Sequence, residues 1–212
     1  EMQRSLVGSE MCIRDSLETE KLSVNLDLMV SMGKSVCFEE KAGCLLEKNI
    51  DECGIRNGEM AENKKIKIGI ISDTHGLLRT EVLDILQSCD CIFHAGDVDR
   101  PELLDTIRSL GALYVVRGNN DGCWAQNLRR SLNFTVGNVK FFMVHDRKDV
   151  AWELGDTQVV IFGHSHQYFA KEIDGRLWLN PGSCGRSRFG GDVTMAVMTV
   201  ENGSWQVEKI VF

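Results

Sequence analysis

Polar side chains of the kind that bind divalent cations follow five apolar, strand-like segments of this chain. They occur in order as Asp-Thr-His-Gly, Gly-Asp, Gly-Asn-Asn-Asp, a single His, and Gly-His-Ser-His. The candidate ligands are Asp73, His75, Asp97, Asn119, His145, His164 and His166. Carboxylate, imidazole and amide ligands without thiolates favour borderline or hard divalent ions over a structural zinc site built from cysteines. Seven ligands are too many for one catalytic ion, so the set predicts two ions that share an Asp and keep positions open for water.

The last of these blocks places two of the chain's five histidines one residue apart. In an extended backbone, residues i and i+2 point to the same side, so we expect His164 and His166 to reach into one space. Asp73 and His75 repeat this spacing. Taken alone, such a pair is more often a solvated hairpin edge than a ligand set. The five ordered blocks together favour a metal centre.

These blocks require a sheet whose strand ends converge, because ligands of open α/β sheets bind outside the carboxyl ends of the strands. Gly137-Asn138 and Asp174-Gly175 are typical of tight hairpin turns. Many strands with few helices predict an α/β fold of two packed mixed sheets flanked by helices. We expect strands near 66–72, 91–95, 113–117, 131–136, 139–144, 158–162, 166–172, 175–180, 193–200 and 204–211, and helices near 77–89, 101–110 and 147–154.

The organised part of the chain starts near residue 60. Residues 17–59 mix charges of both signs with Gly, Cys and Met and keep no structural period. We expect residues 1–59 to be a disordered or non-native leader, and residues 60–212 to form the domain. Residues 11–16, Met-Cys-Ile-Arg-Asp-Ser, resemble the translation of a sequencing adapter, and Met60 resembles a true start. A natural disordered extension is the alternative.

Composition excludes several classes of protein. The net charge of −7 and the absence of a Lys and Arg cluster argue against general binding to nucleic acid or anionic lipid. Eight cysteines without repeated spacing suit reduced thiols in a chain of 212 residues. No apolar run approaches the roughly 20 residues of a transmembrane helix, and we see no secretory signal. We therefore expect a cytoplasmic protein.

The five blocks resemble the pattern of the calcineurin-like metallophosphoesterases: Asp-x-His, Gly-Asp, Gly-Asn-x-Asp/Glu, His and Gly-His-x-His. The similarity extends from Ile68 to about Ser183. More narrowly, the chain resembles the small bacterial and archaeal phosphodiesterase branch, which ends in a hairpin and an Asn-Pro-Gly-Ser loop, here Asn180 to Ser183. The resemblance implies a four-layer α/β/β/α sandwich and hydrolysis of small phosphodiesters.

The resemblance also implies how the ligands divide between two ions. Asp97 would bridge them, with Asp73, His75 and His166 on one ion and Asn119, His145 and His164 on the other. Manganese is the expected metal, with iron, nickel, cobalt or zinc as alternatives. Two bound cations lower the pKa of a shared water, so a metal-bridging hydroxide would attack phosphorus in line.

Three further residues are candidates for catalysis. Many larger relatives carry a His, taken as the proton donor to the leaving oxygen, where this chain has Asn120. An amide delivers no proton at neutral pH, so we expect substrates with good leaving groups. Asp121 either orients its loop for catalysis or simply caps backbone amides. Among Arg117, Arg186 and Arg188, we expect Arg186 to bind substrate phosphate, and His94 is expected to be a buried or supporting histidine.

Two other functions fit the same pattern of elements. A retromer subunit shares this small fold and acts as a protein scaffold, which makes a scaffold the alternative to the enzyme. The intact ligand set argues for the enzyme. A nucleic-acid enzyme would need a basic surface that the composition does not provide. Small relatives often self-associate, which leaves a homo-oligomer open.

Overall fold

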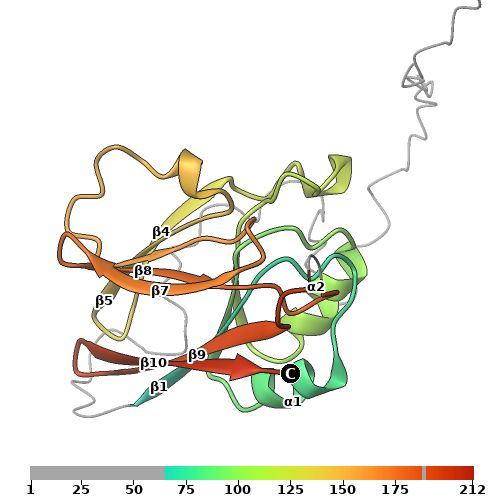
Figure 1. Cartoon of the computed structure of the whole chain (residues 1–212), viewed down its shortest axis with the longest axis horizontal. Helices are drawn as coiled ribbons and strands as arrows, with labels where there is room; N and C mark the ends of the chain where they lie inside the picture. Colours follow the sequence, from blue (N-terminus) through green and yellow to red (C-terminus); the bar gives the residue numbers. More distant parts are fainter. Residues whose placement is uncertain (1–64, 188–189) are drawn as a thin grey trace, which may run out of the picture. The chain divides into compact units, whose positions relative to one another are not determined.

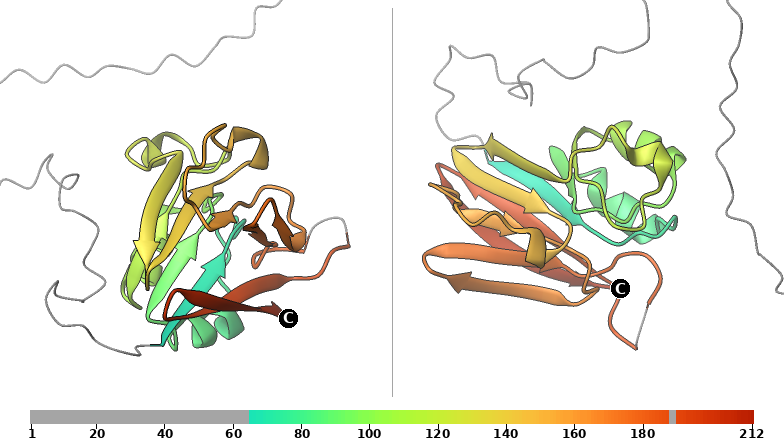
Figure 2. Two further views of the ribbon diagram at one scale, coloured as in Figure 1. Left: turned by 90° about the vertical axis from the view of Figure 1, so that its left-hand side faces the viewer. Right: turned by 90° about the horizontal axis from the view of Figure 1, so that it is seen from above.

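Two mixed β-sheets pack face to face in the computed structural model, which describes residues 65–187 and 190–212 (Figures 1 and 2). The leader expected at 1–59 and Arg188 lie outside these residues. The first sheet has the order β10 (Ser204–Val211), β9 (Thr194–Glu201), β1 (Ile66–Ile71), β2 (Cys91–His94) and β3 (Ala112–Val115). The second has the order β4 (Ser131–Val136), β5 (Val139–Val144), β6 (Val159–Ile161), β8 (Arg176–Pro181) and β7 (Tyr168–Ile173).

Alternation along the strands builds the core between the two sheets. Ile66, Ile68 and Ile70 of β1 are buried together with Phe141 and Met143 of β5 in one cluster. Side chains two residues apart share a face of a strand, so this period places one face of each sheet against the other. The predicted two-sheet arrangement is confirmed.

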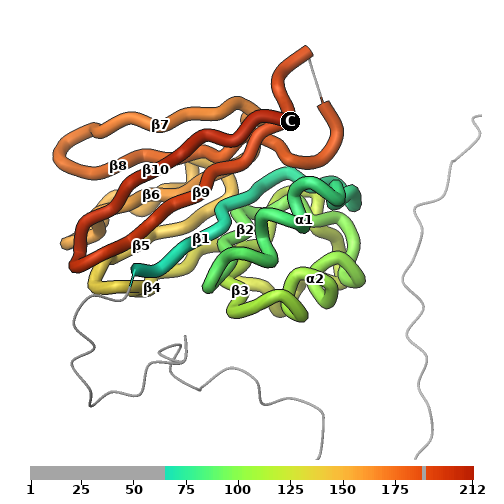
Figure 3. Tube along the Cα trace, turned by 90° about the horizontal axis from the view of Figure 1, so that it is seen from below, coloured from blue at the N-terminus to red at the C-terminus, as the bar shows by residue number. Residues whose placement is uncertain are grey.

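Two helices, α1 (Thr80–Leu86) and α2 (Pro101–Arg108), cover the outer face of the first sheet (Figure 3). Leu86 of α1 and Ile107 of α2 share a buried cluster with Ile71 and Ile92 of the sheet. No helix in the described part of the chain is long and apolar enough to cross a membrane.

The helix predicted at 147–154 is wrong. The segment instead forms one 3-10 turn, η3 (Arg147–Asp149), followed by irregular backbone. Elsewhere in the chain, another 3-10 turn, η2 (Cys123–Ala125), follows β3. Val150 and Leu154, which have i and i+4 spacing, still pack on the outer face of the second sheet. Val150 is extended, with φ −63° and ψ 130°, so packing of its side chain on the sheet overrides helix propensity here.

The parallel strands bring the candidate blocks to one end of the fold. β1, β2 and β3 run parallel in the first sheet, as do β5 and β6 in the second. The amide of His164, after β6, donates to Oδ2 of Asp73, after β1, at 3.1 Å, and so joins the ends of the two sheets. The predicted convergence of distant segments follows from this topology.

His94, the last residue of β2, contacts the loops that follow β1 and β2 and holds them together. It is fully buried, its Nδ1 accepts from the amide of Gly96 at 3.2 Å, and its Nε2 lies 3.1 Å from Oγ1 of Thr74. With Nδ1 as acceptor, Nε2 carries the proton and donates to Thr74. The structure thus places His94 in the supporting role expected of it.

Replacing His94 with Asn should flatten the acid dependence of stability. Burial lowers the pKa of His94 to about 4 from an ordinary 6.5, so below pH 6.5 the unfolded chain binds a proton that the native chain excludes. His94 therefore removes about 3 kcal/mol of native stability as pH falls through this window. Urea unfolding of chelator-treated protein at pH 6.5 and 4.5 measures the effect. Equal acid sensitivity in both proteins would contradict this role.

Candidate metal centre

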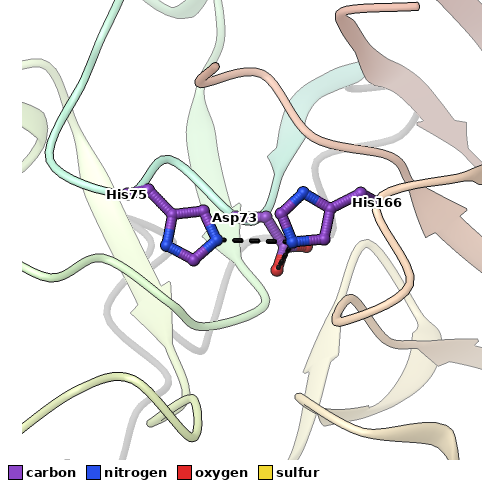
Figure 4. Close-up of side chains that lie close together, drawn as sticks. All are labelled: Asp73, His75 and His166. Atoms are coloured by element: carbon purple, nitrogen blue, oxygen red, sulfur yellow. Dashed lines mark hydrogen bonds and ion pairs between the residues drawn. The ribbon is translucent and has the colours of Figure 1, made fainter. Parts of the chain in front are cut away.

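Three of the candidate ligands meet at the ends of β1 and β6. Asp73, His75 and His166 lie with their ligand atoms within 4.8 Å of one another (Figure 4). Nε2 of His166 is 3.5 Å from Oδ1 of Asp73 and 3.4 Å from Nε2 of His75, and the two rings are stacked with 9° between their planes. Two imidazole nitrogens and a carboxylate oxygen thus face one small space, which suits a divalent cation of borderline hardness.

A second group forms beside the first. Asp97, His145 and His164 also lie with ligand atoms within 4.8 Å of one another. Asn119 belongs with them, because its Oδ1 is 3.0 Å from Nε2 of His145 and 2.9 Å from Nδ1 of His164. Nδ1 of His145 donates to the carbonyl of Ala95 at 2.7 Å, which leaves Nε2 to face the group. All seven predicted ligands are therefore brought together in two neighbouring groups.

Asp97 lies between the two groups. Its Oδ2 is 3.3 Å from Nε2 of His145 and 3.8 Å from Nε2 of His75. Asn120 holds this carboxylate at both oxygens, with its amide nitrogen donating to Oδ1 at 2.8 Å and its Nδ2 to Oδ2 at 2.9 Å. Asn120, predicted to stand where relatives have a proton donor, here orients the shared carboxylate.

The backbone that presents these side chains is strained. Nine non-glycine residues among those described have positive φ, and three of them belong to tight hairpin turns. The other six are Asp73, His75, Asp97, Asp99, His164 and His166. Left-handed backbone of this kind clusters at functional sites, because surrounding contacts must enforce it.

The two histidines of the His-x-His segment converge in a different way from the one predicted, because their backbone is left-handed. The pair was expected to share a side because an extended strand directs i and i+2 alike. Instead His164 and His166 have φ of 67° and 58°, precede β7, and point into different groups. The spacing predicted a shared location, whereas the loop conformation decides which group each ring joins.

Two glycines allow the loops to approach. A Cβ on Gly118 would collide with the amide and Oδ1 of Asp97, and one on Gly163 would collide with Oγ of Ser72. Both positions therefore require glycine for close packing. The loop after β3 can thus lie directly on the shared carboxylate.

Burial and charge shift the pKa values of the central groups. Burial raises the pKa of Asp73 to about 6, with the nearby His145 opposing it. For Asp97, burial acts upward, but a hydrogen bond and charge from His145 outweigh it and hold the pKa below its ordinary value. For His145, burial acts downward, but Asp97 raises its pKa to about 9. Asp97 and His145 behave as a tight ion pair, and the charges of His145 and His75 compensate the neighbouring carboxylate of Asp73 only in part.

The residues fit a bound dication. Oδ1 of Asp73 is fully buried and accepts no hydrogen bond from the described residues. A buried carboxylate oxygen in this state is destabilised unless a cation compensates it. The donor set of carboxylates, imidazoles and an amide oxygen is one that catalytic divalent ions use. Asp73, His75, His166 and Asp97 would hold one ion, and Asp97, Asn119, His145 and His164 a neighbouring one.

The other predicted catalytic residues lie around this centre. Asp121 is 1% exposed, and its carboxylate accepts from the backbone amides of Gly118 and of residues 97–99. It therefore organises two loops. Arg117 donates to the carbonyls of Asp121 and Gly122. Arg186 is exposed and follows Gly185, whose carbonyl accepts from Nε of Arg79.

Two residues that hold the ligands or their loops in place were not predicted from the sequence. Asp99 contacts His75, and its spacing from Asp97 repeats the i, i+2 signal of Asp73 and His75. Asn180 was recognised as part of a loop motif without a role. Its Nδ2 donates to the carbonyl of Gly163 at 2.7 Å, and its Oδ1 accepts from the amide of Gly182 at 2.8 Å, so it ties that loop to the His-x-His segment.

Comparison with known proteins gives several relatives of the same kind. A probable metallophosphoesterase of Methanothermobacter thermautotrophicus is 32% identical over 133 residues, which are 55% of this chain and 76% of that protein. A phosphodiesterase of Methanocaldococcus jannaschii is 29% identical over 140 residues, 56% of this chain and 84% of that protein. The chain therefore covers most of the length of each of these relatives.

Solved structures agree with this fold. The structure of an archaeal phosphodiesterase matches with a TM-score of 0.59 and 27% identity over 69% of this chain and all of that one. Vps29 of Entamoeba histolytica matches with a TM-score of 0.54 and 23% identity over 69% of this chain and 99% of its own, which shows a shared fold. The model of the calcineurin-like phosphoesterase superfamily domain matches residues 66–203. The chain belongs to the calcineurin-like phosphoesterase superfamily.

Proposed function

We propose that this chain is a phosphodiesterase that hydrolyses small phosphodiesters at a centre of two divalent ions. The observation that carries the proposal is the position of Asp97, whose Oδ2 lies between His75 of one ligand group and His145 of the other. A carboxylate shared in this way is the element that two-metal hydrolases use to hold ions about 3.5 to 4 Å apart. The archaeal phosphodiesterase relatives support the choice of a diester.

The chain's own residues would set up the reaction by position and charge. When bound, two divalent ions supply Lewis-acid chemistry: they polarise phosphoryl oxygens and make water a stronger nucleophile at neutral pH. Asn120 and Asp121 fix the shared carboxylate and its loop, so little reorganisation is needed as charge develops. Exposed Arg186, on a loop packed against Thr74, is proposed to bind a phosphate oxygen of the substrate.

The leaving group receives no proton from residue 120. The amide of Asn120 carries no titratable proton, and its Nδ2 already donates to Asp97. General-acid help is worth roughly 10²- to 10⁴-fold, and its absence penalises esters of poor leaving groups most. We therefore propose diesters with stable leaving groups, such as aryl esters, as the substrates most readily hydrolysed. Manganese is proposed as the metal, ahead of iron, nickel, cobalt and zinc.

A protein scaffold is the competing function. The likeness to Vps29 concerns the fold, and both ligand groups keep every predicted residue in this chain. A scaffold would neither need metal nor turn over an ester. A panel of phosphoesters assayed on chelator-stripped protein reloaded with each cation separates the two functions. Metal-dependent turnover of an aryl phosphodiester supports the enzyme, and a flat response to every cation supports the scaffold.

Asp97→Asn should disable the centre. Losing the shared charge weakens both ions, so we expect fewer than two manganese ions per chain and aryl phosphodiester turnover reduced at least about 100-fold. Asp105→Asn is the matched control, because this substitution makes the same change of charge. Asp105 lies on the exposed face of α2, in an ion pair with Arg108. Elemental analysis and steady-state kinetics give the readouts. Full metal content and turnover in Asp97→Asn would reject the shared-carboxylate centre.

Asn120→His should extend activity toward phosphomonoesters. An imidazole at this position can deliver a proton to the leaving oxygen, so we expect phosphomonoester turnover to rise about 10-fold or more relative to the diester. Asn120→Ala is the control for the lost hydrogen bonds to Asp97, and it should lower both activities together. The ratio of the two kcat/KM values is the measurement. An unchanged ratio in Asn120→His would count against the assignment of position 120.

A further inference from the structure

His75 is held from behind by a second carboxylate. Its Nδ1 lies 2.9 Å from Oδ2 of Asp99, and the side chain of His75 is 4% exposed. An ionised carboxylate only accepts hydrogen bonds, so Nδ1 of His75 is the donor in this pair. The proton is thereby fixed on Nδ1, and Nε2 is left with its lone pair directed toward His166 and Asp97.

Asp99 is itself fixed in place by the fold. Its amide donates to Oδ1 of Asp121 at 2.8 Å, and its φ of 67° is one of the left-handed conformations of the site. The second oxygen of its carboxylate, Oδ1, is buried and has no hydrogen-bond partner among the described residues. Within the described residues, the carboxylate of Asp99 is therefore held by the hydrogen bond from Nδ1 of His75. Asp121, Asp99 and His75 form a continuous chain of contacts that ends at the first ligand group.

The two ligand groups differ in this respect. The corresponding nitrogen of His145, in the second group, donates to a neutral carbonyl, that of Ala95, at 2.7 Å. His164 of the second group has a carboxylate nearby, but Nε2 of His164 and Oδ2 of Asp146 are 3.8 Å apart and the His164 side chain is 45% exposed. A carboxylate behind a histidine ligand raises the basicity of the ligand atom more than a carbonyl does. The carboxylate of Asp99 therefore favours cation binding at the first group.

We propose that Asp99 is a positioning residue that fixes the tautomer and orientation of His75, and thereby makes the group of Asp73, His75 and His166 the tighter of the two cation sites. This inference rests on the proposed two-ion centre. It concerns the order and strength of metal binding and not the ester that is hydrolysed. Removing a carboxylate that supports a metal-binding histidine typically lowers the metal affinity about 10- to 100-fold.

The experiment follows metal binding at each group without any assay of turnover. Zn²⁺ is titrated into the chelator-stripped full chain against a competing chelator, and ring ¹⁵N shifts are read separately for His75 and His166 and for His145 and His164. The variants are Asp99→Asn, which keeps an acceptor oxygen without the charge, and Asp99→Ala, which removes both. Asp105→Asn controls for the change of net charge.

In the parent chain, we expect Zn²⁺ to occupy the group of His75 and His166 first, and His75 to be protonated at Nδ1 before metal is added. Asp99→Ala should weaken binding at this group at least about 10-fold and change the tautomer of His75, and Asp99→Asn should weaken binding less. The second group should keep its affinity within about twofold in both variants. Unchanged affinity at the first group in Asp99→Ala, with the His75 tautomer retained, would overturn the role of Asp99. If the parent binds no Zn²⁺ at either group, the proposed two-ion centre itself fails.

Discussion

Two carboxylates and four imidazoles are held at one end of two sheets, with the carboxylates of Asp73 and Asp97 almost entirely removed from water. Like charges this close raise each other's free energy, and the nearby Asp97 helps to raise the pKa of Asp73. His145 offsets part of this charge, but Oδ1 of Asp73 still has no hydrogen-bond donor among the described residues. The arrangement is therefore most stable with cations in it, and the surrounding structure can be understood as a means of enforcing it.

The ligand loops are held in place mainly by residues whose side chains are not ligands themselves. Six ligand or adjacent residues adopt left-handed backbone, each at a cost on the order of 1 kcal/mol or more. Asp121 offsets this cost by accepting hydrogen bonds from four backbone amides in two loops. Asn180 joins the loop at Gly182 to the His-x-His segment through hydrogen bonds. His94 braces the first two loops from within β2. Buried polar groups, rather than regular secondary structure, thus fix the conformation of the ligand loops.

Most of the fold could be predicted from the sequence. Every strand of the structure lies within two residues of its predicted bounds, because the alternation of buried side chains and the turn pairs at Gly137-Asn138 and Asp174-Gly175 are strong local signals. The segment 147–154 was predicted as a helix, and Val150 and Leu154 within it have the i, i+4 spacing that a helix favours. Packing on the second sheet overrides that preference, and no local signal in the sequence reveals it.

The site was predicted in composition but not in geometry. The ordered blocks identified the residues that meet, whereas the left-handed backbone at His164 and His166 could not be inferred from residues other than glycine. Asn120 was identified only as the residue at the position where larger relatives carry a proton donor, and its contact with Asp97 depends on how two loops pack. The pairing of Asp99 with His75 likewise depends on backbone conformation, although the Asp-x-Asp spacing hinted at it.

The most direct test of the central claim is anomalous diffraction from crystals soaked with manganese. The account predicts two anomalous peaks per chain, about 3.5 to 4 Å apart, one among Asp73, His75 and His166, the other among Asn119, His145 and His164, with Asp97 between them. One peak, or peaks away from Asp97, would contradict a centre built on a shared carboxylate.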